Sequence, residues 1–332
     1  MAVTLEDIKN LRTKTGAGMS DCKKALTEAE GDFEKAIEII RKKGLAVAQK
    51  RSDREASEGC VLVKVDGNFG AIIALKCETD FVANNKDFVG LTQSILDAAV
   101  AAKAKSLDEV KALPFQGKTV ADIVLERTGI VGEKLELDGY SFIEGSEIAS
   151  YNHQGKNFLC VLVAFNKEVA DKDYIHEVAL QVAVQNPVAL SESEVPEAVK
   201  AEEMKVAIEK TREEQVSKAV EAALRKAGFN LYISENEEHI KEGIMKGEIT
   251  EAQADEIRAL KAKTAEDKLA NMPAAMIDKI AEGRMSKFFK ENCLVNQVYA
   301  FGDGKQTISE YIKALDKELT ITGFRRFTLK AE

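Results

Sequence analysis

Residues 57–75 read Ser-Glu-Gly-Cys-Val-Leu-Val-Lys-Val-Asp-Gly-Asn-Phe-Gly-Ala-Ile-Ile-Ala-Leu. Apolar residues such as Cys60, Leu62 and Val65 lead into the turn Asp66-Gly67-Asn68, and the apolar run 71–75 follows it. An Asp-Gly turn between two apolar stretches is typical of a β-hairpin, because glycine readily adopts the backbone angles that a tight turn needs. The stretch therefore predicts two antiparallel strands.

The same order of elements recurs later in the chain. After the hairpin, residues 87–103 carry an apolar stripe with the spacing of a helix. A second set follows, with predicted strands at 148–151 and 158–165 and a helix from Asp173. This internal repeat predicts an α+β fold made of two related subdomains, each with an antiparallel sheet on one side and helices on the other.

The first part of the chain is predicted to be helical. Thr4 is placed to cap one helix, Ser20 a second and Asp32 a third, and Gly44 is expected to end the third helix. A three-helix bundle of this size has a small core and gains stability from an outside contact. Met19, in the turn before the second helix, could supply that contact or could fill a gap in the core.

A long segment rich in Ala, Glu, Lys and Arg interrupts the second subdomain. Apolar and small residues within it step by three and four, which is the spacing of a coiled-coil seam. We therefore expect an inserted helical arm, whose polar faces are either solvated or contact a partner. The expected domains are a helical module at 1–54, core subdomain N at 55–146, core subdomain C at 147–196 and 273–332, and the arm at 197–272.

The stretch Cys77-Glu-Thr-Asp-Phe-Val-Ala-Asn84 lies between a predicted strand and a predicted helix. A large apolar ring at Phe81 beside the carboxylate of Asp80 is a candidate contact site. The alternative is that Phe81 folds back into the core, as most phenylalanines do. The second copy of the repeat has no Thr-Asp-Phe, so the fold alone does not require these residues.

Composition excludes several classes of function. The chain has 56 acidic and 47 basic side chains and a pI near 5.3, which disfavours non-specific binding to nucleic acid or to an anionic membrane. Its five cysteines form no Cys-x-x-Cys pair, and no stretch is typical of a signal peptide or a membrane span. We expect a cytoplasmic protein in a reducing compartment.

Nothing in the sequence indicates covalent catalysis. No metal-ligand cluster, hydrolytic triad or phosphate-binding loop stands out, so we expect no cofactor, no metal and no catalytic residue. His153 is the one histidine in a predicted turn, where polar residues are common in any case. These observations favour a binding protein with several separate contact modules.

Two motifs closely resemble the signatures of the bacterial elongation factor Ts family. They are Arg12-Thr-Lys-Thr-Gly-Ala-Gly-Met-Ser-Asp-Cys-Lys-Lys-Ala-Leu26 and Cys77-Glu-Thr-Asp-Phe-Val-Ala-Asn84. Shorter agreements occur at 150–153, 282–285, 296–297 and 322–327. The resemblance implies an N-terminal bundle like ubiquitin-associated domains and a guanine-nucleotide exchange factor that binds elongation factor Tu.

The resemblance also implies roles for particular residues. The tip that would approach the partner's nucleotide site and displace its Mg²⁺ comprises Thr79, Asp80, Phe81, Val82, Ala83 and Asn84. Further contacts with elongation factor Tu are implied for Leu11, Met19, Ile130, Val131 and His153. A 2:2 assembly with that partner stays open. The alternative function is a non-enzymatic scaffold or chaperone that acts through the helical arm.

Three features depart from the family pattern. Ser20 stands where many relatives have a second methionine, the arm is longer than in short members, and the chain ends at Glu332 without an extra C-terminal helix. We therefore expect partner binding to depend mainly on the N-terminal module and the core.

Overall fold

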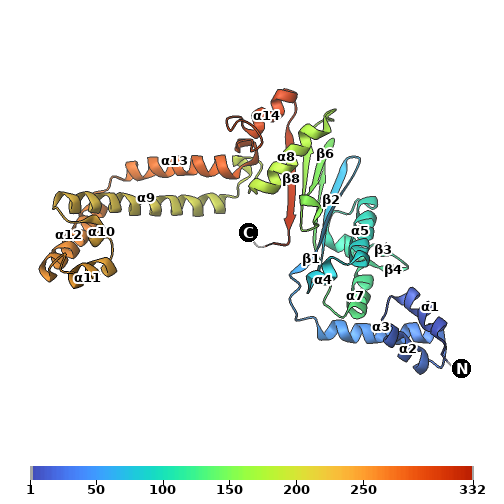
Figure 1. The fold of residues 1–332 in the computed structure, drawn as a ribbon. Helices are drawn as coiled ribbons and strands as arrows, with labels where there is room; N and C mark the ends of the chain where they lie inside the picture. Colours follow the sequence, from blue (N-terminus) through green and yellow to red (C-terminus); the bar gives the residue numbers. More distant parts are fainter. Residues whose placement is uncertain (1–2, 331–332) are drawn as a thin grey trace. The chain divides into compact units, whose positions relative to one another are not determined.

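The computed structural model describes residues 3–330 of the 332-residue chain. It forms two compact units (Figure 1). One contains the chain up to Leu190 together with the part from Val298 onward, and it holds the N-terminal helices and both sheets. The other, Ser191–Gln297, is helical and corresponds to the arm. The predicted α+β class with an inserted helical arm is confirmed.

Three helices form the N-terminal module: α1 (Leu5–Thr15), α2 (Met19–Glu28) and α3 (Phe33–Lys50). Thr4 caps α1 and Asp32 caps α3, as predicted, but the prediction for Ser20 is wrong, because it lies inside α2 and the cap position is Gly18. The expectation that α3 ends at Gly44 is wrong. Gly44 lies in the middle of α3 at its crossing with α7 (Val120–Val131), where a Cβ atom added to Gly129 would lie 2.0 Å from the Gly44 Cα. This glycine permits close helix packing instead of ending the helix.

The predicted hairpin is confirmed. Strand β1 (Glu58–Asp66) pairs antiparallel with β2 (Phe69–Cys77) from the Glu58–Cys77 pair to the Asp66–Phe69 pair. Gly67, at the turn, has a φ of +56°, which favours glycine. Strand β5 (Glu136–Glu144) joins the other edge of β2 and gives the order β1-β2-β5.

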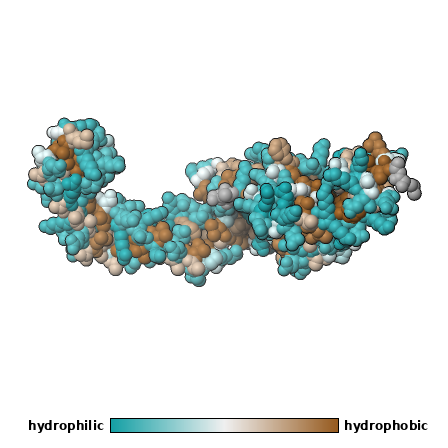
Figure 2. Space-filling model, turned by 90° about the horizontal axis from the view of Figure 1, so that it is seen from below, coloured by the Kyte–Doolittle hydropathy of each residue, from teal (hydrophilic) through white to brown (hydrophobic). Residues whose placement is uncertain are grey.

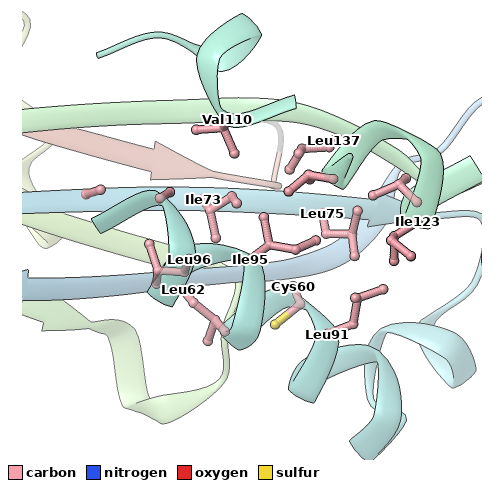
Figure 3. Close-up of a cluster of buried hydrophobic side chains, with 14 of the residues drawn as sticks. Cys60, Leu62, Ile73, Leu75, Leu91, Ile95, Leu96, Val110, Ile123 and Leu137 are labelled. Atoms are coloured by element: carbon pink, nitrogen blue, oxygen red, sulfur yellow. The ribbon is translucent and has the colours of Figure 1, made fainter. Parts of the chain in front are cut away.

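Both faces of this first sheet are buried. One face packs against α5 (Lys86–Ala101), α6 (Leu107–Ala112) and α7, and Figure 3 shows Ile95 and Leu96 of α5 beside residues of the sheet. The opposite face, with Val61 and Ile72, packs against the second sheet. Burial on both faces explains why 71–75 reads as a continuous apolar run instead of an alternating one. A short hairpin, β3 (Pro114–Phe115) and β4 (Lys118–Thr119), precedes α7.

The second sheet repeats the plan of the first. Its order is β6-β7-β8, formed by β6 (Glu147–Asn152), β7 (Leu159–Phe165) and β8 (Ile321–Thr328). Helix α8 (Lys172–Gln185) covers its outer face, so the layers run helix, sheet, sheet, helix (Figure 1). The short helix α14 (Ile308–Leu315) precedes β8. The predicted repeat of two related subdomains is confirmed in element order and pairing.

The helical unit contains five α-helices: α9 (Glu197–Lys226), α10 (Leu231–Ser234), α11 (Glu237–Met245), α12 (Glu251–Ala270) and α13 (Ala274–Asn292). Its small core contains Leu224, Ile240 and Ile257. Helix α13 packs on α9, where Arg284 and Glu214 form an ion pair of 2.6 Å. We expected residues from 273 onward to belong to core subdomain C. Those up to Gln297 belong to the helical unit instead, because α13 buries Ile277, Ala281 and Met285.

Candidate partner-binding tip

The Thr-Asp-Phe stretch forms a single helical turn directly after β2. This turn, α4 (Asp80–Ala83), begins at Thr79, whose hydroxyl oxygen accepts a hydrogen bond of 3.5 Å from the Val82 N–H. The Asn84 side chain donates to the Asp80 carbonyl over 2.8 Å. Side chains at both ends of the turn therefore hold it together.

Phe81 is 86% exposed, and the neighbouring Asp80 is exposed as well. The alternative in which Phe81 folds back into the core is wrong, because the turn is oriented by other side chains: Ala83 is buried and Val82 packs against the core. A phenylalanine side chain left in water forgoes about 1.5–3 kcal/mol of burial free energy. An apolar ring held in this way is suited to insertion into a partner.

Glu133 supports the tip from a loop that follows α7. Its two carboxylate oxygens accept hydrogen bonds from Thr79, one from the backbone N–H at 3.0 Å and one from the hydroxyl at 2.7 Å. Sequence reasoning missed Glu133. Its partner lies 54 residues away, and only the pairing of β2 with β5 brings the two together.

Glu78 makes a second set of contacts beside the tip. Its carboxylate accepts a hydrogen bond of 2.7 Å from the Lys134 N–H and pairs with Arg51 at 2.8 Å and Arg54 at 3.4 Å. Burial alone would raise the pKa of Glu78, but these hydrogen bonds and the two guanidinium charges hold it below the ordinary value of 4.5. Glu78 thus joins the base of the tip to the residues just after α3.

Two predicted contact residues lie in the N-terminal module. Met19, the first residue of α2, is half-buried and packs against the bundle core. Leu11 is fully buried among Cys22 and Leu26, and its role as a contact residue stays a prediction. A small bundle depends on its few large apolar side chains, so Leu11 supports the bundle core.

The remaining predicted residues occupy different surroundings. Val131 is 39% exposed at the end of α7, two positions before Glu133, so the fold brings it toward the tip. Ile130 is half-buried and faces the N-terminal module, 3.8 Å from where a Cβ at Gly16 would lie. His153 lies in a turn of the second subdomain, where its ring packs edge-on against Tyr151 and Phe158.

Two further observations concern metal ions and membranes. Among residues 3–330, no group of His, Cys, Asp and Glu is arranged to hold a metal ion. No helix in the same range is both long and apolar enough to cross a membrane. Figure 2 shows one face of the molecule, on which hydrophilic residues dominate and hydrophobic residues form small separate patches. Phe81 is one of several large hydrophobic side chains that are exposed, together with Met245 and Tyr232.

Comparison with known proteins decides the family. Residues 78–331 match the family described as elongation factor TS. Proteins named elongation factor Ts from Bacteroides fragilis and Parabacteroides distasonis are 58% and 57% identical over the full length of both chains. One from Porphyromonas gingivalis is 40% identical, also over both full lengths. The chain belongs to the elongation factor Ts family.

Membership in the elongation factor Ts family makes the chain a translation elongation factor. The matched residues begin at Glu78, directly before the tip, and extend through β5 of the first sheet, the second sheet and the helical unit. The full-length relatives additionally cover the N-terminal module and the hairpin of β1 and β2. The resemblance found in the signature motifs is thus confirmed over the whole chain.

Proposed function

We propose that this elongation factor Ts family member is a guanine-nucleotide exchange factor. It binds elongation factor Tu in the GDP-bound state, displaces Mg²⁺ and speeds the release of GDP, so that GTP can bind in its place. The observation that carries the proposal is the 86% exposure of Phe81 on a turn fixed by hydrogen bonds. Family membership supplies the context of translation elongation.

The mechanism is differential binding. A factor that prefers the nucleotide-free partner must weaken nucleotide binding by the same factor, because linkage between two binding sites is reciprocal. The Phe81 ring would supply this preference by entering a site that opens only when the nucleotide site is disturbed. No covalent bond forms or breaks, so the proposed activity is not enzymatic in the chemical sense.

Loss of Mg²⁺ explains why GDP would leave faster. The bound ion is among the largest positive charges near the diphosphate, and its removal weakens the attraction that holds the nucleotide. The exposed carboxylate of Asp80 enters the partner together with Phe81, because the two residues are adjacent on one turn. The N-terminal module, with Met19 near its surface, and the end of α7 with Val131 provide further contacts.

Stopped-flow fluorescence tests the proposal. Elongation factor Tu loaded with a fluorescent GDP analogue is mixed with excess unlabelled GDP and increasing amounts of the chain. We expect release to accelerate to a plateau with the wild type and much less with Phe81→Ala. Met245→Ala is a matched control, since Met245 is 88% exposed but lies in the helical unit. Unchanged release at saturating wild type would contradict the proposal.

A scaffold or chaperone role for the helical unit is the second candidate. The observation in its favour is that this unit exposes Met245, Tyr232 (63%) and Leu269 (54%). Replacing residues 227–272 by a flexible linker removes α10, α11 and α12 but keeps α9 and α13. Exchange activity should survive this change under the first proposal. The second candidate would be favoured if the wild type does not accelerate exchange and if the replacement abolishes its scaffold or chaperone activity.

A further inference from the structure

The tip has little intrinsic stability of its own. Helix α4 has four residues, and an isolated single turn is unfavourable because nucleation fixes several backbone angles for few hydrogen bonds. Phe81 adds no packing, since its ring is 86% exposed. The orientation of the ring therefore depends on the contacts of the residues on either side.

Glu133 makes the contacts that set the start of this turn. Its carboxylate accepts from both polar hydrogens of Thr79, at 3.0 Å and 2.7 Å. Because the Thr79 hydroxyl proton points to Glu133, the lone pairs of that hydroxyl oxygen are left to accept the Val82 N–H. Hydrogen bonds to a carboxylate are stronger than those between neutral groups. Glu133 thus fixes both the backbone and the capping side chain of Thr79.

A further hydrogen bond joins the same two segments, this time with the donor in the loop and the carboxylate beside the tip. Lys134 follows Glu133 and donates its backbone N–H to the Glu78 carboxylate at 2.7 Å, while Glu78 precedes Thr79. Two adjacent residues of the loop and two adjacent residues of the tip are therefore joined by three hydrogen bonds. Such a connection restricts both sliding and rotation of the tip relative to the core.

We propose that Glu133 is a positioning residue for the nucleotide-exchange tip. The inference rests on the proposed exchange function and adds to it a residue that need not touch the partner. An interaction that is already fixed in the free protein costs less to form on binding. Glu133 therefore acts on the rate of nucleotide release by holding Phe81 and Asp80 in the orientation that enters the partner.

The first test separates positioning from affinity. Maximal GDP release and the half-saturating concentration are measured for wild type, Glu133→Ala and Glu133→Gln. We expect Glu133→Ala to lower the maximal rate by about tenfold or more, because small misplacements of a reacting group have large effects. Half-saturation should change little, because the other contacts remain. Glu133→Gln keeps one acceptor oxygen and should restore part of the rate.

Glu136→Gln serves as the matched control. Glu136 is the first residue of β5, three positions after Glu133, and its carboxylate pairs with the Lys134 side chain at 3.1 Å. The same chemical change at this position should leave the maximal rate near the wild-type value. A fall of equal size in both variants would overturn the assignment of positioning to Glu133.

The second test does not depend on exchange activity. The chain has no tryptophan, so Phe81→Trp introduces a single tryptophan at the tip, whose fluorescence can be excited selectively over that of the tyrosines. Adding Glu133→Ala to this variant should lower the fluorescence anisotropy, whereas adding Glu136→Gln should not. Unchanged anisotropy after Glu133→Ala would overturn the proposal. If the wild type accelerates release, an unchanged maximal rate in Glu133→Ala would overturn it as well. A wild type without exchange activity would refute the proposed function, while anisotropy would still report on the tip.

Discussion

Gly129 of α7 and Gly44 of α3 meet with no side chain between them, and a Cβ atom at Gly129 would lie 2.0 Å from the Gly44 Cα. A Cβ at Gly44, in contrast, would lie 3.4 Å from the Gly129 Cα, which is an ordinary contact. The crossing of these helices joins the N-terminal module to subdomain N within one compact unit. The two glycines therefore differ in how well each position tolerates a side chain.

This asymmetry predicts opposite results for two equivalent substitutions. Gly129→Ala should lower the free energy of unfolding by about 1–3 kcal/mol, because the added methyl group meets backbone atoms that cannot rotate away. Gly44→Ala should be neutral or slightly stabilising, because alanine favours a helix over glycine by about 1 kcal/mol. Chemical denaturation followed by circular dichroism measures both. Equal destabilisation by the two variants would contradict the geometry.

Phe81 and Phe88 predict a second contrast. Phe81→Ala should change the free energy of unfolding by less than about 0.5 kcal/mol, as is usual for an exposed side chain. Phe88 is buried in the core of subdomain N, so Phe88→Ala should lower the free energy of unfolding by about 3–5 kcal/mol. Denaturation curves at equal protein concentration provide the comparison. A large loss of stability in Phe81→Ala would show that its ring packs in solution.

Glu78 predicts a dependence of stability on acid pH. Although burial would raise its pKa, the Lys134 N–H, Arg51 and Arg54 lower it below 4.5 in the folded chain. A carboxyl group with a depressed folded pKa stabilises the protein above its unfolded pKa and loses that contribution as the pH falls. Unfolding free energies should therefore fall less steeply below about pH 4.5 in Glu78→Gln than in the wild type.

Arg51→Ala provides the companion measurement. It removes one cationic partner of Glu78 but leaves the carboxyl group and the Lys134 hydrogen bond in place. Its acid dependence should lie between those of the wild type and Glu78→Gln. Identical slopes in all three proteins would show that Glu78 makes no pH-dependent contribution.

The cysteines predict slow chemical modification in the native state. All five are buried thiols, and burial raises the pKa of both Cys60 and Cys77 to about 12. Because the thiolate is the reactive species, a disulfide reagent at neutral pH should label them slowly until the protein unfolds. Titration in denaturant, where all five should react, gives the reference. Prompt native labelling would contradict the burial of these side chains.

The sequence predicted elements whose causes are local. The Asp66-Gly67 turn, the caps at Thr4 and Asp32 and the recurrence of the hairpin each depend on neighbouring residues, and each is confirmed. Gly44 was misread because glycine is associated with helix ends, while its reason here is a helix that crosses from elsewhere in the chain.

The candidate site shows the same limit. The resemblance indicated the tip, and the exposure of Phe81 agrees with a contact residue. Glu133 could not be found from the sequence, because an isolated carboxylate carries no pattern and its partner Thr79 is distant along the chain. The resemblance implied a contact role for Leu11, which is fully buried in the bundle core. Contacts between residues that are distant along the chain therefore could not be predicted from the sequence.

The face shared by the two sheets bears on how the repeat could have arisen. Val61, Ile72 and Ala74 of one copy and Cys160, Leu162 and Ala164 of the other form one buried cluster. The Val61 N–H also donates to the Asn157 carbonyl across the copies at 2.7 Å. A single-copy ancestor would have left this apolar face in water, so it would have needed a second identical chain to cover it. Gene duplication would then have joined two subunits that already depended on each other.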